Sequence, residues 1–189
     1  MAKPTAMPSP TSVAALTPVP TPPKKSVSSP AVSAALVDAR ALASAGKTDL
    51  AIAALEAILK SDPLNAEAHW ALAGAYRAKR KGPQGCEELR AYARVAPSGP
   101  HAAEAKRHLA VCSAVALLDQ EKLDEAHAAF EVIVRKNKSF PDGHYWLGTM
   151  QSLRGENEAA CASFMSYINL DASGPYADRA TAQLGTLGC

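Results

Sequence analysis

The chain has 189 residues, with 20 Lys or Arg against 18 Asp or Glu, so its formal net charge is only +2. A charge this small gives no sequence-wide field that would attract nucleic acid or an anionic membrane, and we expect neither as a partner. Aromatic residues make up 5% of the chain, so we expect a core of small side chains that let helices pack closely. No apolar stretch approaches the roughly 18 residues of a membrane-spanning helix, which predicts no membrane insertion.

Residues 1–30 differ in composition from the rest of the chain. They contain eight of the 14 prolines, three lysines and no acidic residue. Such a segment cannot bury enough apolar area to offset the entropy of ordering. We therefore predict a disordered Pro/Ser/Thr-rich linker over residues 1–30 and one folded domain over residues 31–189. The linker would either fold onto a partner or join this domain to something upstream.

The later prolines lie only between apolar periodic stretches, which predicts a series of helices separated by turns. The first pair of helices turns at Gly46, and Ala51, Leu55 and Ile58 form the apolar stripe of its second helix. Pro63 marks the end of that pair.

The next helix covers residues 65–76, where Trp70, Ala73 and Tyr76 recur at helical spacing. Pro63 and Pro97 are 34 residues apart, and a 34-residue helix-turn-helix period is typical of tetratricopeptide repeats. After Ser98-Gly-Pro100 no breaker intervenes before Glu121. This predicts an unusually long helix that joins the two halves of the domain.

The last repeat is the most specific. His144-Tyr-Trp-Leu-Gly148 is followed by Gly155, Ala160, Phe164 and Tyr167, the positions of the Leu-Gly pair, turn Gly, small residue and helix-B aromatics of the tetratricopeptide repeat (TPR) family. The chain resembles that family over about residues 33–174. The resemblance implies an all-α solenoid of about four helix pairs in a right-handed superhelix, with residues 175–187 as a capping helix.

In this family the first helix of each pair lines a concave groove where partner peptides dock. Projecting those positions onto this chain implies a groove formed by Arg40, Trp70, Arg77, Leu118, Asp119, Tyr145, Thr149 and Ser152. Trp70 and Tyr145 are the expected anchors because large amphipathic rings dominate binding hot spots. Burial of Trp70 in the core between repeats is the alternative. The family's Lys, Asn and Arg clamp for a peptide carboxylate is not reproduced.

A longer repeat is also present. Ser98-Gly-Pro100 and Ser173-Gly-Pro175 are 75 residues apart, as are Cys86 and Cys161. We expect a duplicated unit, residues 31–112 and 113–189.

The four cysteines fit this duplication. At about 1.5 Å per residue, Cys86 and Cys112 reach the same level of an antiparallel helix pair, and both face its seam. Cys161 and Cys189 match in level if the chain bends at Gly188. We therefore expect two disulfides, with four buried free thiols as the alternative. Paired cysteines would indicate a periplasmic or other extracytoplasmic location, and free thiols a cytoplasmic one.

The sequence gives little support for catalysis or for metal binding. None of the five histidines, His69, His101, His108, His127 and His144, forms a metal-binding pair at i and i+4 within a known motif. We predict no catalytic residue, no metal and no cofactor. The basic run Arg77, Lys79, Arg80 and Lys81 is explained by a solvated helix end, or alternatively by an acidic partner segment.

These observations favour a non-enzymatic adaptor that binds a partner protein or extended peptide along the groove. Two alternatives remain. One is an extracytoplasmic sensor or assembly module of a membrane-anchored protein, stabilised by two disulfides. The other is a thiol-based redox switch, although no Cys-x-x-Cys motif marks a reactive thiol.

Overall fold

The computed structural model describes residues 29–189, and this part of the chain contains nine α-helices and no strand. The predicted all-α fold is confirmed. The helices are α1 (Pro30–Ser44), α2 (Thr48–Ser61), α3 (Ala66–Ala78), α4 (Gly82–Val95), α5 (Ala102–Leu118), α6 (Leu123–Lys136), α7 (Pro141–Leu153), α8 (Asn157–Leu170) and α9 (Ala177–Leu187). They form four antiparallel pairs, with α9 packed on α8 as the capping helix.

Residues 1–28 of the predicted linker lie outside the described residues. α1 begins at Pro30, one residue before the expected start of the folded domain at residue 31. Ser29 caps this helix by accepting a hydrogen bond from the Val32 N–H at 3.3 Å. Proline suits the first position of a helix, where its missing N–H has no intrahelical partner.

The turn inside each helix pair depends on one residue with a positive φ angle. Gly46 and Gly155 fill this position in the first and fourth pairs, with φ of 74° and 73°. In the second and third pairs the position is filled by Arg80 and Glu121, with φ of 58° and 60°. Glycine adopts this conformation without strain, whereas side chains with a Cβ do so at a cost of about 1 kcal/mol or more.

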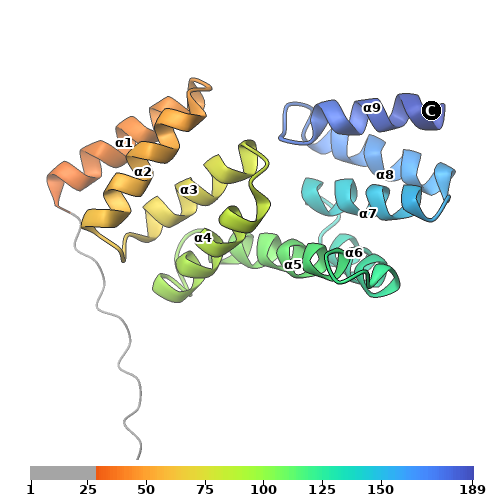
Figure 1. The fold of residues 1–189 in the computed structure, drawn as a ribbon, viewed down its shortest axis with the longest axis horizontal. Coiled ribbons are helices and arrows are strands. Elements are labelled where there is room, and N and C mark those ends of the chain that lie inside the picture. The colour runs from red at the N-terminus through yellow and green to blue at the C-terminus, as the bar shows by residue number, and fades with distance from the viewer. Residues whose placement is uncertain (1–28) are drawn as a thin grey trace, which may run out of the picture.

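The helices stack into an open arch (Figure 1). α1, α2 and α3 form one arm, α5 and α6 cross the base, and α7, α8 and α9 form the other arm. Each helix packs on the next one along the chain, and small apolar clusters run through the stack rather than one central core. Fully buried rings and aliphatic side chains anchor these clusters: Tyr92, Tyr167, Phe130, Phe164, Leu55, Leu72 and Met150.

The stacking is not uniform along the inner side of the arch. α1 packs against α3, and α5 packs against α7, but α3 and α5 make no comparable contact. α5 is the longest of the described helices, with 17 residues, as expected for the helix after Ser98-Gly-Pro100. The inner surface is therefore open between the second and third pairs.

Candidate functional site

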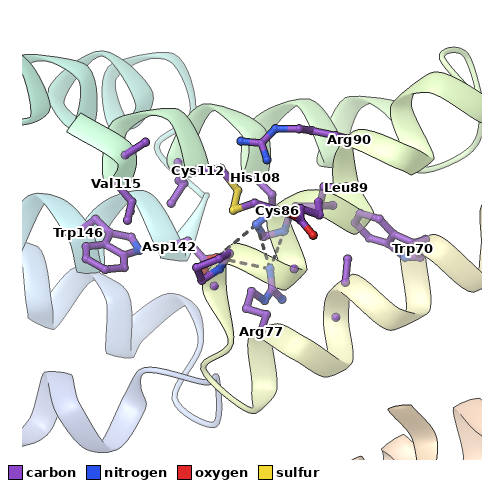
Figure 2. A pocket seen from close by; sticks show the side chains of 18 of the residues that line it. Trp70, Arg77, Cys86, Leu89, Arg90, His108, Cys112, Val115, Asp142 and Trp146 are labelled. Atoms are coloured by element: carbon purple, nitrogen blue, oxygen red, sulfur yellow. Dashed lines mark hydrogen bonds and ion pairs between the residues drawn. A yellow bond between two sulfur atoms is a disulfide. The ribbon is translucent and has the colours of Figure 1, made fainter. Parts of the chain in front are cut away.

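A cavity of about 480 Å³ occupies this opening (Figure 2). Residues of α3, α4, α5 and α7 line it, together with Tyr176 before α9. We call it the inner cavity. Its volume falls within the range of about 300–1,000 Å³ that ligand-binding pockets occupy.

Small residues on the walls explain why the space stays open. Gly74 on α3 and Gly85 on α4 line the cavity, and a Cβ added at Gly74 would meet nothing within 4 Å. Ala71 lines the same wall, whereas the residue 75 positions later is Trp146. Ala71 therefore leaves room at a position where the residue 75 places later carries a large ring.

Three polar side chains meet in the inner cavity, one from each of three successive helix pairs. Arg77 Nη1 of α3 lies 2.6 Å from His108 Nε2 of α5 and 3.4 Å from Asp142 Oδ2 of α7. His108 Nδ1 lies 3.2 Å from the same carboxylate oxygen. A His108 tautomer with its proton on Nδ1 satisfies both contacts, because Nδ1 then donates to Asp142 and Nε2 accepts from Arg77.

This polar cluster, Arg77, His108 and Asp142, is enclosed by the fold. His108 is 6% exposed and Asp142 is 4% exposed, whereas the Arg77 side chain is 36% exposed. A buried carboxylate is costly unless it is paired, and here a guanidinium and an imidazole partner it. The described bonds of Arg77 all use Nη1, so Nε and Nη2 remain for a ligand in the cavity.

Aromatic side chains form the apolar part of the lining. Trp70 and Trp146 are the two tryptophans of the chain, and both line the inner cavity. The ring of Trp70 stacks on His101 with centroids 4.5 Å apart. Burial raises the pKa of Tyr176 to about 12.

Two of the stacked ring pairs lie 75 positions apart in the sequence. Tyr145 stacks on Tyr176 with centroids 4.3 Å apart, and these two residues follow Trp70 and His101 by 75 positions. The equivalent histidines His69 and His144 also match, since each places Nε2 near a backbone carbonyl six residues earlier, at 3.1 Å and 2.8 Å.

One disulfide forms part of the cavity wall. Cys86 of α4 and Cys112 of α5 are bonded, with Cα atoms 6.0 Å apart, and both line the cavity. Cys112 lies one turn after His108 on α5.

The second disulfide joins Cys161 of α8 to Cys189, with Cα atoms 6.2 Å apart. The chain bends at Gly188, whose φ is 78°, as the sequence-based pairing required. Both predicted disulfides are therefore present, and no cysteine of the chain is free in the structure.

The structure brings only some of the predicted groove residues together. Trp70, Arg77 and Asp119 line the inner cavity, whereas Arg40, Leu118, Thr149 and Ser152 do not. Arg40 pairs with Glu67 instead. Thr149 donates its hydroxyl proton to the Tyr145 carbonyl within α7.

Tyr145, predicted as an anchor, lies in the apolar core. It is 6% exposed because the rings of Trp146, Phe164, Tyr167 and Tyr176 surround it. Its neighbour Trp146 lines the inner cavity instead.

Three side chains of the basic run contact other groups of the fold. Arg77 points into the inner cavity, and Lys79 binds Asp49 with Nζ 2.8 Å from Oδ2. Lys81 Nζ lies 5.9 Å from the centre of the Tyr76 ring. These side chains thus have separate partners within the fold.

Sequence reasoning missed His108, Asp142 and Trp146 as site residues. His108 and Asp142 come from different helices and belong to no known sequence motif. Asp142 also lies in the first turn of its helix, where an acidic side chain is normally explained by its favourable interaction with the helix dipole. The signal for Trp146 was available, because a Trp adjacent to Tyr145 occupies the neighbouring face of the same helix.

Residues 29–189 contain neither a candidate metal-binding cluster nor a membrane-spanning helix. This part of the chain contains no group of three or more His, Cys, Asp or Glu side chains placed to hold a metal ion. None of its helices combines the length and apolar character that a bilayer crossing needs.

Comparisons with known proteins agree with this architecture. Two solved structures with the fold are TTC0263, a TPR protein of Thermus thermophilus (21% identity, TM-score 0.51, 82% of this chain and 80% of that chain covered), and a fragment of MamA from Desulfovibrio magneticus RS-1 (20% identity, TM-score 0.50, 75% and 76% covered). A comparison with curated proteins found no match. A model of the tetratricopeptide repeat family matches residues 36–85 and 113–178, more than half of the chain. The chain therefore belongs to the tetratricopeptide repeat family.

Proposed function

We propose that this protein is a non-enzymatic adaptor that binds a partner protein or extended peptide on the inner side of its arch, with the inner cavity as the anchoring point. Proteins of the TPR family are typically interaction scaffolds, and solenoids offer extended concave surfaces for this purpose. The observation that carries the proposal is the inner cavity itself, in which both tryptophans and the exposed edge of Arg77 face one space. Trp and Arg are the side chains most enriched at binding hot spots.

Position-specific crosslinking tests this proposal. A photo-crosslinking amino acid is placed at Gly74 or Ala116 in the cavity wall, and at the exposed positions Ala128 of α6 or Ala162 of α8 as controls. Illumination in extract of the native organism should give one discrete adduct from the cavity positions only. Adducts of equal yield from all four positions, or none from the cavity positions, would refute an anchoring role for the cavity.

The two disulfides favour an extracytoplasmic location for this adaptor, because such bonds persist in oxidising compartments. This location is tested by intact mass after denaturing alkylation of protein taken from its native compartment. Two intact bridges support it, whereas four alkylated thiols favour a cytoplasmic scaffold. Partial alkylation of Cys86 and Cys112 alone would support the redox switch instead.

A further inference from the structure

The segment before the described residues has a pattern of its own. Every third residue from position 4 to position 22 is apolar: Pro4, Met7, Pro10, Val13, Leu16, Val19 and Pro22. A polyproline II helix has three residues per turn, so in that conformation these side chains share one edge. Further prolines at positions 8, 18, 20 and 23 pre-set the φ angle for this conformation.

The inner cavity offers the kind of surface that binds such an edge. Proline-rich ligands dock in grooves lined by aromatic rings, because a preformed extended helix loses little entropy on binding. Trp70 of α3, Trp146 of α7 and Tyr176 line the cavity from separate elements. Ala71 and Gly74 leave room between these rings and the polar cluster.

Charge at the cavity is also complementary to this segment. Residues 1–28 carry Lys3, Lys24 and Lys25 and no acidic residue. The charged side chains of the cavity lining are three carboxylates, Glu87, Asp119 and Asp142, and two guanidinium groups, Arg77 and Arg90. The segment is therefore attracted rather than repelled at the entrance.

The connection is long enough for the segment to reach the cavity within one chain. Leu16 lies 13 residues before Ser29, the N-cap of α1, which spans about 40 Å at about 3.1 Å per residue. α1 packs directly on α3, which forms one wall of the cavity. The 15 residues of α1 extend over about 22 Å, and neighbouring helix axes are about 8–10 Å apart.

We propose that residues 4–25 bind in the inner cavity of their own chain, with the edge formed by Val13, Leu16 and Val19 against Trp70, Trp146 and Tyr176. A partner that uses the cavity must then displace this segment. The proposal concerns the occupant of the cavity and does not require the partner to be known.

The test uses the full chain and its intrinsic fluorescence, because both tryptophans line the inner cavity. One variant carries Val13→Asp, Leu16→Asp and Val19→Asp. A matched control carries Thr11→Asp, Ala14→Asp and Thr17→Asp, which add the same charge on a different edge of the same segment. All six positions lie outside the helices of residues 29–189, so the helical far-UV circular dichroism signal should not change.

The first variant should shift tryptophan emission to longer wavelength and increase its quenching by acrylamide, whereas the control should match the wild type. Dilution by about a hundredfold should leave the wild-type spectrum unchanged, since a contact within one chain depends on effective concentration alone. Identical spectra for all three proteins, or equal shifts in both variants, would overturn the proposal. A shift of the wild type on dilution would show that a second copy, not the same chain, supplies the occupant. If the first variant shows the shift and still crosslinks to a partner from position 74, the segment has left the cavity and the adaptor function remains intact.

Discussion

The hydroxyl of Tyr92 accepts a hydrogen bond from the backbone N–H of His101 at 2.8 Å, and this bond closes the Ser-Gly-Pro turn between α4 and α5. The same bond recurs 75 residues later, where Tyr167 accepts from the N–H of Tyr176 at 3.0 Å. Both tyrosines are fully buried. The same tyrosine-to-backbone hydrogen bond thus fixes both turns. These turns place His101 and Tyr176 against the rings on which they stack.

Replacing Tyr92 with Phe removes this acceptor and leaves the partly buried N–H of His101 without its partner. We expect the free energy of unfolding to fall by about 1–2 kcal/mol, measured by urea denaturation under non-reducing conditions. Tyr76→Phe is the control, because the Tyr76 hydroxyl bonds Glu56 in an exposed setting. Equal effects of the two substitutions would contradict the role assigned to the turn.

The positive φ angles at Arg80 and Glu121 lead to a second prediction. Glu121→Gly should raise the free energy of unfolding by about 1 kcal/mol, because glycine relieves strain that outweighs its greater freedom in the unfolded chain. Gly155→Ala should lower it by a similar amount, since Gly155 fills the same turn position with φ of 73°. Thermal unfolding of both variants checks the two signs, and a destabilised Glu121→Gly protein would refute the argument.

Asp142 and Asp178 form a matched pair for testing the polar cluster. Both occupy the second position of a helix, α7 and α9, but Asp142 is buried and Asp178 is exposed. Asp178→Ala removes only a favourable helix-dipole interaction of about 0.3–1 kcal/mol. Asp142→Ala also leaves His108 and Arg77 without their shared carboxylate and should cost about 3 kcal/mol. Chemical denaturation of the two variants gives the comparison, and equal losses would contradict it.

The disulfide in the cavity wall should stabilise the whole stack. Its cysteines are 26 residues apart in sequence, so the Cys86→Ala, Cys112→Ala double variant should lose about 3 kcal/mol. The Cys161→Ala, Cys189→Ala variant frees only α9 from its end. Hydrogen exchange should become faster in the helices of the whole stack in the first variant, and in α9 alone in the second.

The contact between His69 and Glu88 predicts a dependence of stability on pH. His69 Nδ1 lies 2.6 Å from Glu88 Oε2. Burial lowers the pKa of His69, but the bond to Glu88, the Pro63 carbonyl and the Glu88 charge outweigh it, so the pKa is raised above 6.5. A raised histidine pKa adds stability that is complete below the unfolded value of about 6.5 and is lost as the pH rises through the folded value.

Glu88→Gln should remove this dependence. The stability advantage of the wild type over the variant should therefore be largest below about pH 6.5 and shrink at higher pH, measured by urea denaturation at a series of pH values. An advantage that grows above neutral pH would show that the sign is wrong.

The sequence predicted the helix pairs, the capping helix and both disulfides because these depend on local periodicity and on counting residues along helices. Pro63, Gly155 and the two Ser-Gly-Pro turns mark boundaries directly. The inner cavity could not be predicted in the same way. It lies where α3 and α5 make no contact comparable to that of the other helices, and this depends on small residues such as Ala71 and Gly85 on different helices.

The same distinction between local sequence and packing applies to the residues of the candidate site. Trp70 and Arg77 were predicted because the first helix of a repeat faces inward. His108 and Asp142 were missed because nothing in their local sequence shows that the fold brings them together with Arg77. Tyr145 was predicted as an anchor because it is a large amphipathic ring at a projected groove position. In the fold its ring packs against those of Tyr176 and Phe164.

The bond between Arg77 and Asp142 bridges 65 residues and joins the second helix pair to the fourth. In a stack of repeats, stability is approximately a sum of terms within repeats and between nearest neighbours, and each end can open independently. A contact that passes over the intervening pair makes the unfolding of one arm costly for the other. The two halves of this protein should therefore unfold as a single cooperative unit. A ligand bound in the inner cavity should likewise slow the local opening of the helices in both arms of the arch.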